Sequence, residues 1–159
     1  MAIKVAILTI SDSCARGKRA DTSGQTMKDM LCEGKFEVCE KIVVSDDHQA
    51  IAEALKDFSD RKGIDVILTS GGTGLGPRDV TPEATASVCE KVIPGLGEIL
   101  RSEGFRRSAN AVLSRGVAGM RNNTLIINLP GSPKAVRECL EVILDILPHA
   151  IEMMHGGGH

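Results

Sequence analysis

Short apolar segments alternate along this chain with segments whose apolar residues recur at helical spacing. The apolar segments, each about as long as a buried strand, are residues 4–10, 38–44, 64–69 and 124–129. Between the second and the third, Ile51, Leu55 and Phe58 share one face of an expected helix. Alternation of this kind predicts an α/β fold, a three-layer α/β/α domain with a mostly parallel central sheet.

The 159 residues predict a single domain, spanning 1–159, that can bury one hydrophobic core. Hydrophobic residues make up 42% and charged residues 25%, as in ordinary soluble domains. The five cysteines are odd in number and form no C-x-x-C pair, so neither a disulfide framework nor a zinc site is indicated. Without a signal peptide or an apolar run of the roughly 20 residues that a bilayer needs, we expect a cytoplasmic protein that does not bind membranes.

Aromatic residues are only 2% of the chain: three phenylalanines, with no tryptophan and no tyrosine. This composition excludes modules that stack single-stranded bases on aromatic side chains, and aromatic cages around quaternary ammonium groups. The net charge of -2 also disfavours binding to duplex nucleic acid. A flat heterocycle held by this chain would therefore lie mainly on backbone and aliphatic surface, with charged groups fixing its phosphates.

Positive charge is concentrated in residues 101–121, where five arginines accompany the single acid Glu103. The arginines are Arg101, Arg106, Arg107, Arg115 and Arg121. A local excess of this kind is typical either of a site for a small anionic ligand or of a solvated face, and the sequence leaves both open.

Ligands of open parallel sheets bind beyond the carboxyl ends of the strands. Four expected loops with polar residues leave these ends, at 11–13, 45–47, 70–79 and 130–133. Two of the following helices begin with a cap-and-proline pair, Thr81-Pro82 and Ser132-Pro133. We expect the last helix to continue from Ser132 as far as Leu147.

The loop after the third expected strand carries the strongest chemical signal. Residues 69–83 read TSGGTGLGPRDVTPE, and glycine backbone of this kind can approach a phosphate closely. The alternative is a tight turn without a ligand. A Walker A loop is excluded because Gly76 is followed by Pro77, and the dinucleotide fingerprint G-x-G-x-x-G fails as well, which disfavours a dehydrogenase.

Three polar residues beside these loops each have two interpretations. Asp79 either accepts backbone hydrogen bonds in a turn or ligates Mg²⁺ beside a phosphate. Asp46 either caps the next helix, as the spacing to Gln49 suggests, or joins Asp79 at the same metal. Ser132 can cap a helix and still leave free N–H groups that attract an anion.

Four segments together resemble the molybdenum cofactor biosynthesis family. They read ILTISDS (7–13), TSGGTGLGPRDVTPEAT (69–85), LIINLPGSPK (125–134) and LPHAIE (147–152). The resemblance covers nearly the whole chain in order, and the combination is far more specific than one glycine loop. It is closest to the branch of the family that adenylylates molybdopterin, which includes the amino-terminal domain of gephyrin.

The resemblance implies a homotrimer and a reaction in which the terminal phosphate of molybdopterin attacks the α-phosphate of ATP, with Mg²⁺ assisting. It implies that Asp46 and Asp79 are catalytic and hold the metal. Residues implied for the nucleotide are Gly71, Gly72, Thr73, Gly74, Asn128, Pro130, Gly131, Ser132 and Pro133, and those for the pterin side are Ser11 and Asp12. Arg115 and the neighbouring arginines are our candidates for receiving the molybdopterin phosphate.

The main alternative is a relative that binds molybdopterin without catalysis or serves as a trimeric scaffold, as in the MoaB-type branch. The presence of both Asp46 and Asp79 favours the active branch. The resemblance also allows for a separate molybdenum-insertion protein as a partner. Because no phenylalanine falls in the implied ligand loops, we expect no phenyl ring stacked on adenine.

Overall fold

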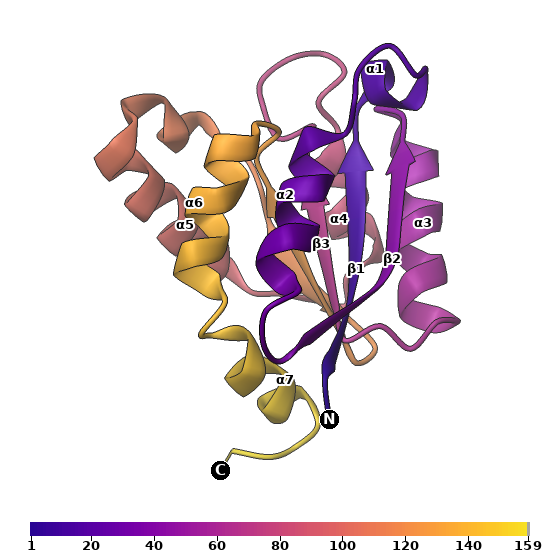
Figure 1. Ribbon diagram of the computed structural model, residues 1–159, viewed down its shortest axis with the longest axis vertical. Helices are drawn as coiled ribbons and strands as arrows, with labels where there is room; N and C mark the ends of the chain where they lie inside the picture. Colours follow the sequence, from indigo (N-terminus) through magenta and orange to yellow (C-terminus); the bar gives the residue numbers. More distant parts are fainter. Residues whose placement is uncertain (159) are drawn as a thin grey trace.

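The computed structural model describes residues 1–158 and places a mixed sheet between layers of helices (Figure 1). Its strands are β1 (Ile3–Ile10), β2 (Phe36–Val44), β3 (Val66–Ser70), β4 (Lys91–Val92), β5 (Ala118–Arg121) and β6 (Thr124–Leu129). They are arranged in the order β2-β1-β3-β6-β5-β4. The first four in this order run parallel, β5 pairs antiparallel with β6, and β4 pairs antiparallel with β5. The mostly parallel α/β fold expected from the sequence is confirmed.

The sequence does not predict β4 and β5 because both are too short to carry a periodic apolar signal. Strand β4 has two residues, both exposed, and β5 has four. Gly119 in β5 lies so close to the β4 backbone that an added Cβ would come within 2.7 Å of the Lys91 carbonyl oxygen. The pairing of these strands therefore depends on close backbone approach rather than on an apolar pattern.

The helices cover both faces of the sheet. They are α1 (Asp12–Ala15), α2 (Thr22–Leu31), α3 (His48–Asp60), α4 (Thr81–Val88), α5 (Pro94–Arg107), the 3₁₀ helix η1 (Ala109–Leu113), α6 (Pro133–Ile143) and α7 (Leu147–Met154). Helices α3 and α4 pack on one face, and α2, α5, α6 and α7 on the other (Figure 1). No helix within residues 1–158 combines the length and the apolar character that crossing a bilayer would take.

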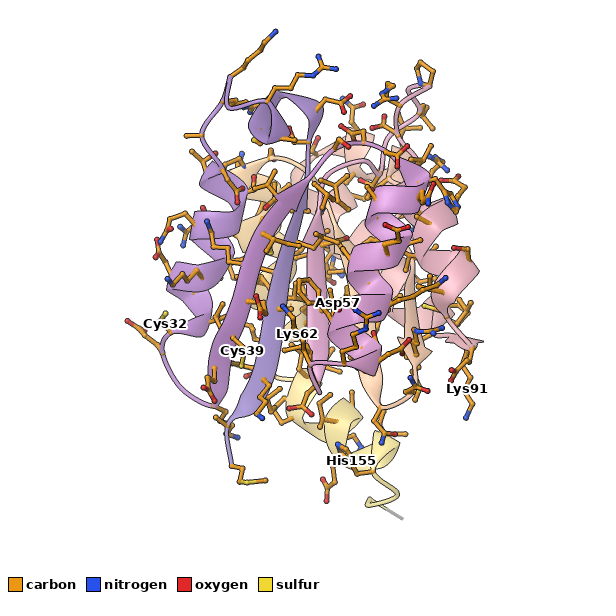
Figure 2. All side chains as sticks on the ribbon, turned by 90° about the vertical axis from the view of Figure 1, so that its right-hand side faces the viewer. Cys32, Cys39, Asp57, Lys62, Lys91 and His155 are labelled. Atoms are coloured by element: carbon orange, nitrogen blue, oxygen red, sulfur yellow. The ribbon has the colours of Figure 1, made fainter. Side chains whose placement is uncertain are left out.

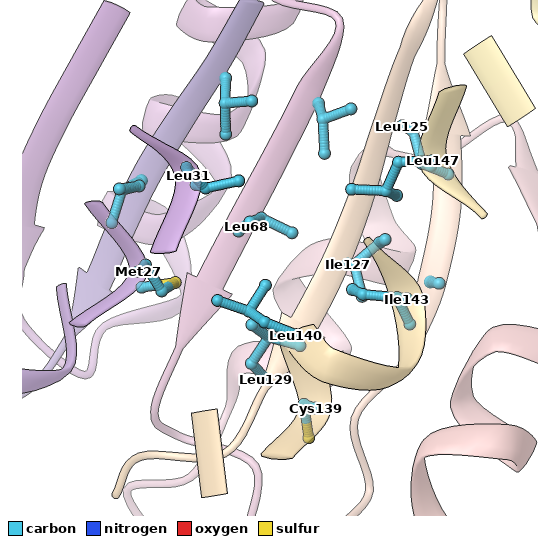
Figure 3. Close-up of a cluster of buried hydrophobic side chains, with 14 of the residues drawn as sticks. Met27, Leu31, Leu68, Leu125, Ile127, Leu129, Cys139, Leu140, Ile143 and Leu147 are labelled. Carbon is cyan, nitrogen blue, oxygen red and sulfur yellow. The ribbon is translucent and has the colours of Figure 1, made fainter. Parts of the chain in front are cut away.

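Two hydrophobic cores form because side chains of a strand alternate between the faces of the sheet. In β1, Val5 and Ile7 point into the core under α2 and α6, whereas Ala6 and Leu8 point into the core under α3 and α4. Figure 3 shows the first of these cores, in which Leu140 of α6 packs over β3 and β6. Helices thus cover both faces of the parallel part of the sheet, and its strands are buried on both sides, as is usual for parallel sheets.

The last helix differs from the expectation. Instead of running unbroken to Leu147, α6 ends at Ile143 and α7 begins at Leu147. Pro148 lies in the first turn of α7, where its missing N–H costs nothing. In a continuous helix the same proline would remove a hydrogen bond to Leu144 and clash with its carbonyl, so the chain ends one helix and starts another.

The five cysteines, all within the described residues, are free thiols. Cys32 and Cys39 lie at exposed positions (Figure 2). Cys139 lies on the buried face of α6, and this burial raises the pKa of its thiol to about 11. A thiol with such a pKa stays protonated near neutral pH and is a poor nucleophile.

We expect Leu140→Ala to lower the free energy of unfolding by about 2–5 kcal/mol, because Leu140 is fully buried and its truncation leaves a cavity. Met153→Ala, at an exposed position of α7, is the matched control and should change it by no more than about 0.5 kcal/mol. Urea denaturation followed by circular dichroism measures both. Equal losses for the two variants would contradict the assigned core.

Candidate active site

The carboxyl ends of β1, β2, β3 and β6 lie at one edge of the sheet because these strands are parallel. The segments that leave this edge contain Ser11, Asp12, Asp46, Gly71, Gly72, Thr73, Gly74, Asp79, Pro130, Gly131, Ser132 and Pro133. Asn128 lies in β6 just before its end, and Arg115 reaches the same edge from the segment between η1 and β5. The structure therefore gathers all the residues implied by the sequence around one edge.

The glycine loop begins with backbone conformations that other residues adopt only with strain. Gly71 and Gly72 have φ angles of +101° and +67°. A Cβ on Gly71 would collide with the carbonyl oxygen of Ile10. Thr81, the first residue of α4, donates from Oγ1 to the carbonyl of Gly71 at 2.9 Å. Thr81 is therefore not the helix cap expected from the sequence; Val80 takes that position and makes no side-chain capping bond.

The carboxylate of Asp79 lies inside the turn that closes the glycine loop. Its Oδ2 accepts a hydrogen bond from the N–H of Gly76 at 2.9 Å, and its own N–H donates to the Gly76 carbonyl at 3.1 Å. A Cβ on Gly74 would come within 2.8 Å of the same Oδ2, so a side chain there would displace the carboxylate from its place in the turn. Among residues 1–158, Oδ1 of Asp79 has no hydrogen-bond partner. Asp79 thus closes the turn and keeps one oxygen available to a ligand.

Asp46 does not cap α3; Asp47 does, accepting from a first-turn N–H at 2.9 Å. Asp46 instead accepts from the N–H of Asp12 through Oδ2 at 2.9 Å. Its other oxygen, Oδ1, faces the glycine loop, 3.2 Å from where a Cβ on Gly72 would lie. Burial raises the pKa of Asp46, the charges of Asp12 and Asp79 raise it further, and hydrogen bonding from the Asp12 backbone opposes the rise.

Arg78 joins this group although the sequence assigns it no role. Its Nε and Nη2 donate to the two carboxylate oxygens of Asp12 at 3.0 and 2.9 Å. These hydrogen bonds hold the pKa of Asp12 below its usual value, against the smaller effect of burial. Arg78 thereby links the glycine loop to the segment that follows β1.

Arg115 holds the glycine loop from another direction. Its Nε donates to the carbonyl of Gly74 and its Nη2 to that of Asp79, each at 2.8 Å, while Nη1 pairs with Glu83. Its backbone N–H donates to the Thr73 carbonyl at 2.9 Å. A contact of Arg115 with a molybdopterin phosphate stays a prediction, and it would have to replace or supplement these bonds.

The other arginines of the basic stretch have partners as well. Their nearest partners are Gly116 for Arg101, Glu103 for Arg106, Glu141 for Arg107 and Asp60 for Arg121. Three of these four partners are carboxylates, and the fourth is a backbone carbonyl. Within the described residues, the positive charge of the stretch is therefore taken up mostly by intramolecular pairs, not left as a free basic patch.

The loop after β6 is tied to its neighbours through its own carbonyls. Ser70 donates to the Pro130 carbonyl at 3.0 Å, and Ser23 to the Gly131 carbonyl at 2.5 Å. Ser132 caps α6 as expected, its Oγ accepting a first-turn N–H at 3.1 Å. The start of α6 is therefore fixed relative to β3 and α2, with its N-terminal end directed at the site.

Asn128 differs from the other implied ligand residues because its side chain is buried and fully used by the protein. Its Nδ2 donates to Oγ1 of Thr69 at 3.0 Å and to Oγ1 of Thr85 at 2.9 Å. Its Oδ1 accepts from the N–H of Val117 at 3.2 Å. These bonds connect β6 to β3, to α4 and to the residue that precedes β5. A direct contact of Asn128 with the nucleotide stays a prediction.

Two cavities flank the loop after β6 and share Ser132 as a lining residue. The first has a volume of about 270 Å³ and is lined largely by small and hydroxyl-bearing residues, including Ser11 and Gly71. The second, of about 390 Å³, lies between α5, α6 and β6 and is mainly apolar, with Leu100 and Val142 in its wall. The sequence does not predict this second cavity. Adjoining cavities suit an enzyme that brings two substrates together.

Asp46 and Asp79 fit magnesium by their donor chemistry. Each keeps a carboxylate oxygen without a hydrogen-bond partner among residues 1–158, and Mg²⁺ is usually held by one or two carboxylates together with water and substrate phosphates. No group of three or more histidine, cysteine, aspartate or glutamate residues suited to a metal occurs in that part of the chain. A magnesium ion here would therefore depend on the phosphates of a bound nucleotide for further ligands.

Comparison with known proteins identifies the family. A profile described as a probable molybdopterin binding domain matches residues 6–149, which include every segment of the site. The chain belongs to this molybdopterin-binding family. The match includes β2, β3 and β6 in full, β1 from Ala6 onward, and the carboxyl ends of all four strands.

Relatives within the family are similar over nearly the whole chain. A molybdopterin adenylyltransferase of Helicobacter pylori is 39% identical over 156 residues, which cover 97% of this chain and 89% of that protein. The crystal structure of the molybdopterin biosynthesis enzyme MoaB from Thermus thermophilus has 49% sequence identity and a TM-score of 0.92, covering 97% of both chains. A molybdenum cofactor biosynthesis bifunctional protein of Chlorobaculum tepidum is 36% identical and is matched over 50% of its length.

Three polar side chains at the site of this family member were not assigned a role from the sequence: Arg78, Thr81 Oγ1 toward the loop, and Glu83. Each acts on a partner that only the folded chain brings near. A usable signal existed for Arg78, since an arginine next to Asp79 in a glycine loop is an obvious candidate for pairing with an acid at the same edge. Nothing in the local pattern around Glu83 indicates its pairing with Arg115.

We expect Gly71→Ala to destabilise the protein by about 1–3 kcal/mol, because alanine is strained at this positive φ and its Cβ would strike the Ile10 carbonyl. Gly95→Ala is the control: Gly95 lies in the first turn of α5 with open space around it, and alanine there should be neutral or slightly stabilising. Thermal and urea unfolding compare the two variants. A Gly71 variant as stable as the Gly95 variant would contradict the loop conformation.

Asp46→Asn is expected to stabilise the protein at neutral pH. The pKa of Asp46 is raised above its ordinary value of 3.8, so ionisation costs more in the folded than in the unfolded state. The resulting penalty is absent below pH 3.8, grows as the pH rises toward the raised native pKa, and is complete above it. Urea unfolding should therefore show a gain in stability for the variant at pH 7 that disappears near pH 3. A gain of equal size at both pH values would point to a cause other than the charge.

Proposed function

We propose that this chain transfers AMP from ATP to the terminal phosphate of molybdopterin, giving adenylyl-molybdopterin and pyrophosphate in molybdenum cofactor biosynthesis. One observation carries the proposal: Asp46, Asp79 and the glycine loop meet at one edge of the sheet, in a chain similar over 97% of its length to a curated molybdopterin adenylyltransferase. The two carboxylates supply metal-binding oxygens, and the loop supplies backbone close enough to approach phosphates.

The proposed reaction needs compensation of the negative charge on its two substrates, and it needs no nucleophilic side chain from the protein. An oxygen of the molybdopterin phosphate forms a bond to the α-phosphorus of ATP, and the bond from that phosphorus to the bridging oxygen of pyrophosphate breaks. Both reactants are anionic, so positioning and electrostatic stabilisation dominate such a transfer. Bound magnesium would neutralise charge on the ATP phosphates. Asp46 and Asp79 would hold it, while the glycine loop and the N-terminal end of α6 orient the nucleotide.

The two cavities offer separate places for the two ring systems. Ser11, implied for the pterin side, lines the polar cavity. Asn128 and Pro130, implied for the nucleotide, line the apolar cavity, while Gly71 and Gly131, also implied for the nucleotide, line the polar one. We infer that the pterin enters the first and adenine the second. None of the phenylalanines is among the residues lining either cavity, which supports a grip by backbone and aliphatic surface.

A relative that binds molybdopterin without catalysis is the alternative. The observation that favours this alternative is the 49% sequence identity with the MoaB structure from Thermus thermophilus. Two observations favour catalysis: both aspartates face the loop, and curated relatives at 31–39% identity are named molybdopterin adenylyltransferase.

The proposal also includes the oligomeric state, the localisation, the metal dependence and a partner protein. We propose that the protein forms a homotrimer, that it acts in the cytoplasm, and that its activity depends on Mg²⁺, as the resemblance implies. A separate molybdenum-insertion protein is also part of the proposal. It is supported by relatives named as bifunctional, in which the region similar to this chain makes up about half the length.

We expect Asp46→Asn and Asp79→Asn each to lower kcat for AMP transfer by about 100-fold or more, because each removes charge that places the metal and the phosphates. The assay follows radiolabelled AMP from ATP onto molybdopterin with Mg²⁺, and with EDTA, which should abolish transfer until Mg²⁺ is restored. Asp57→Asn, on the far part of α3, is the control and should retain full activity. Wild-type turnover by both site variants would contradict the metal role, and binding of molybdopterin without any transfer would favour the non-catalytic alternative.

A further inference from the structure

We propose that Arg78 is a positioning residue of this site: acting through Asp12, it fixes the carboxylate of Asp46 toward the glycine loop. The inference rests on the proposed function, since it assigns a role within the same reaction. It adds a residue that neither the sequence motifs nor the substrate chemistry assigns. Its test includes measurements on the protein without substrates, so the two proposals can fail separately.

The first link is the ion pair between Arg78 and Asp12. The guanidinium donates from Nε and Nη2 to both carboxylate oxygens, at 3.0 and 2.9 Å. This two-pronged geometry fixes the direction of the carboxylate as well as its charge. The residues are 66 positions apart, so the pair ties the loop after β3 to the segment after β1.

The second link is a reciprocal pair of hydrogen bonds between Asp12 and Asp46. The N–H of Asp12 donates to Oδ2 of Asp46 at 2.9 Å, and the N–H of Asp46 donates to Oδ1 of Asp12 at 3.1 Å. Each carboxylate is therefore held by the backbone of the other residue. Oδ1 of Asp12 serves both links, because it also accepts from Nη2 of Arg78.

The two links together fix the orientation of the Asp46 carboxylate. With Oδ2 held by the Asp12 backbone, Oδ1 lies toward Gly72. Two carboxylates held this close repel each other, and Arg78 is the cation that offsets this repulsion: it pairs with Asp12, and its charge also acts on Asp46. Removal of Arg78 would leave the two acids uncompensated, and we expect Asp12 and Asp46 to move apart and lose their reciprocal bonds.

A direct contact of Arg78 with ATP is the competing explanation, since its side chain is 62% exposed. The two explanations differ in their dependence on Asp12. A positioning residue acts through Asp12, so the effects of Arg78→Gln and Asp12→Asn on the same quantity should overlap strongly. A residue that contacts ATP by itself should give effects that add.

The first experiment measures amide hydrogen exchange by NMR in the protein free of metal and nucleotide. In Arg78→Gln we expect the amides of Asp12 and Asp46 to exchange about tenfold faster, because the bonds that protect them are weakened. Arg61→Gln is the matched control: Arg61 is an exposed arginine paired with Asp57 outside the site, and its loss should leave both amides unchanged. Unchanged protection of Asp46 in Arg78→Gln would overturn the proposal.

The second experiment measures the affinity for ATP with Mg²⁺ by calorimetry, and kcat at saturating metal. We expect Arg78→Gln to weaken metal-dependent ATP binding by about 10–100-fold, the usual effect of losing a residue that orients a metal ligand. Arg78→Lys, which keeps the charge but lacks the fork, should recover only part of the loss. The double variant with Asp12→Asn should be little worse than either single variant. Additive losses would overturn positioning and favour direct contact with ATP.

The outcomes separate the two proposals. If the wild type binds ATP with Mg²⁺ and Arg78→Gln shows the expected losses, but no AMP reaches molybdopterin, the positioning role stands and the proposed function fails. If the wild type transfers AMP and Arg78→Gln matches it in exchange, binding and kcat, the function stands and the positioning role fails. Absence of metal-dependent ATP binding by the wild type would overturn both.

Discussion

The pairing of β1 with β2 on one side and with β3 on the other is the constraint on which the site depends. Ile10 is paired with Val44, and Thr9 with Ser70, so the three strands end almost level. The residues that follow them then start from nearly the same height at the sheet edge. A slip of one residue would turn every side chain of a strand to the opposite face and separate the groups beyond it. The buried cores on both faces hold this register.

Above that edge, polar contacts across the loops set the geometry of the site. The Gly71 carbonyl is held by Thr81, and the Asp79 carboxylate closes its own turn with Gly76. Asp46 is placed at a cost in stability, because burial and neighbouring carboxylates disfavour its charge. A site that must receive a cation is expected to carry such strain before the cation binds, and the surrounding hydrogen bonds maintain it.

Features encoded in neighbouring residues were predictable from the sequence, and pairings between distant residues were not. The parallel strands, the glycine loop and the Ser132 cap each follow from a short local pattern. The pairing of Asp12 with Asp46 spans 34 residues, and that of Asp12 with Arg78 spans 66. The local spacing from Asp46 to Gln49 even favoured a helix cap, because it could not show that the N–H of Asp12 lies nearby. Strands β4 and β5 could not be predicted for another reason: they are too short to show a periodic pattern.

The distribution of charge bears on which form of ATP such a site can accept. Asp12, Asp46 and Asp79 gather at the glycine loop, while Arg115 is engaged by Glu83 and by loop carbonyls. Of these three carboxylates, Arg78 pairs with Asp12 alone. Free ATP would bring further negative charge to carboxylates that already repel one another, whereas ATP with bound magnesium brings cationic charge next to them. Since none of the three phenylalanines lines either cavity, where a phenyl ring could stack on adenine, this electrostatic selection would carry a large share of nucleotide recognition.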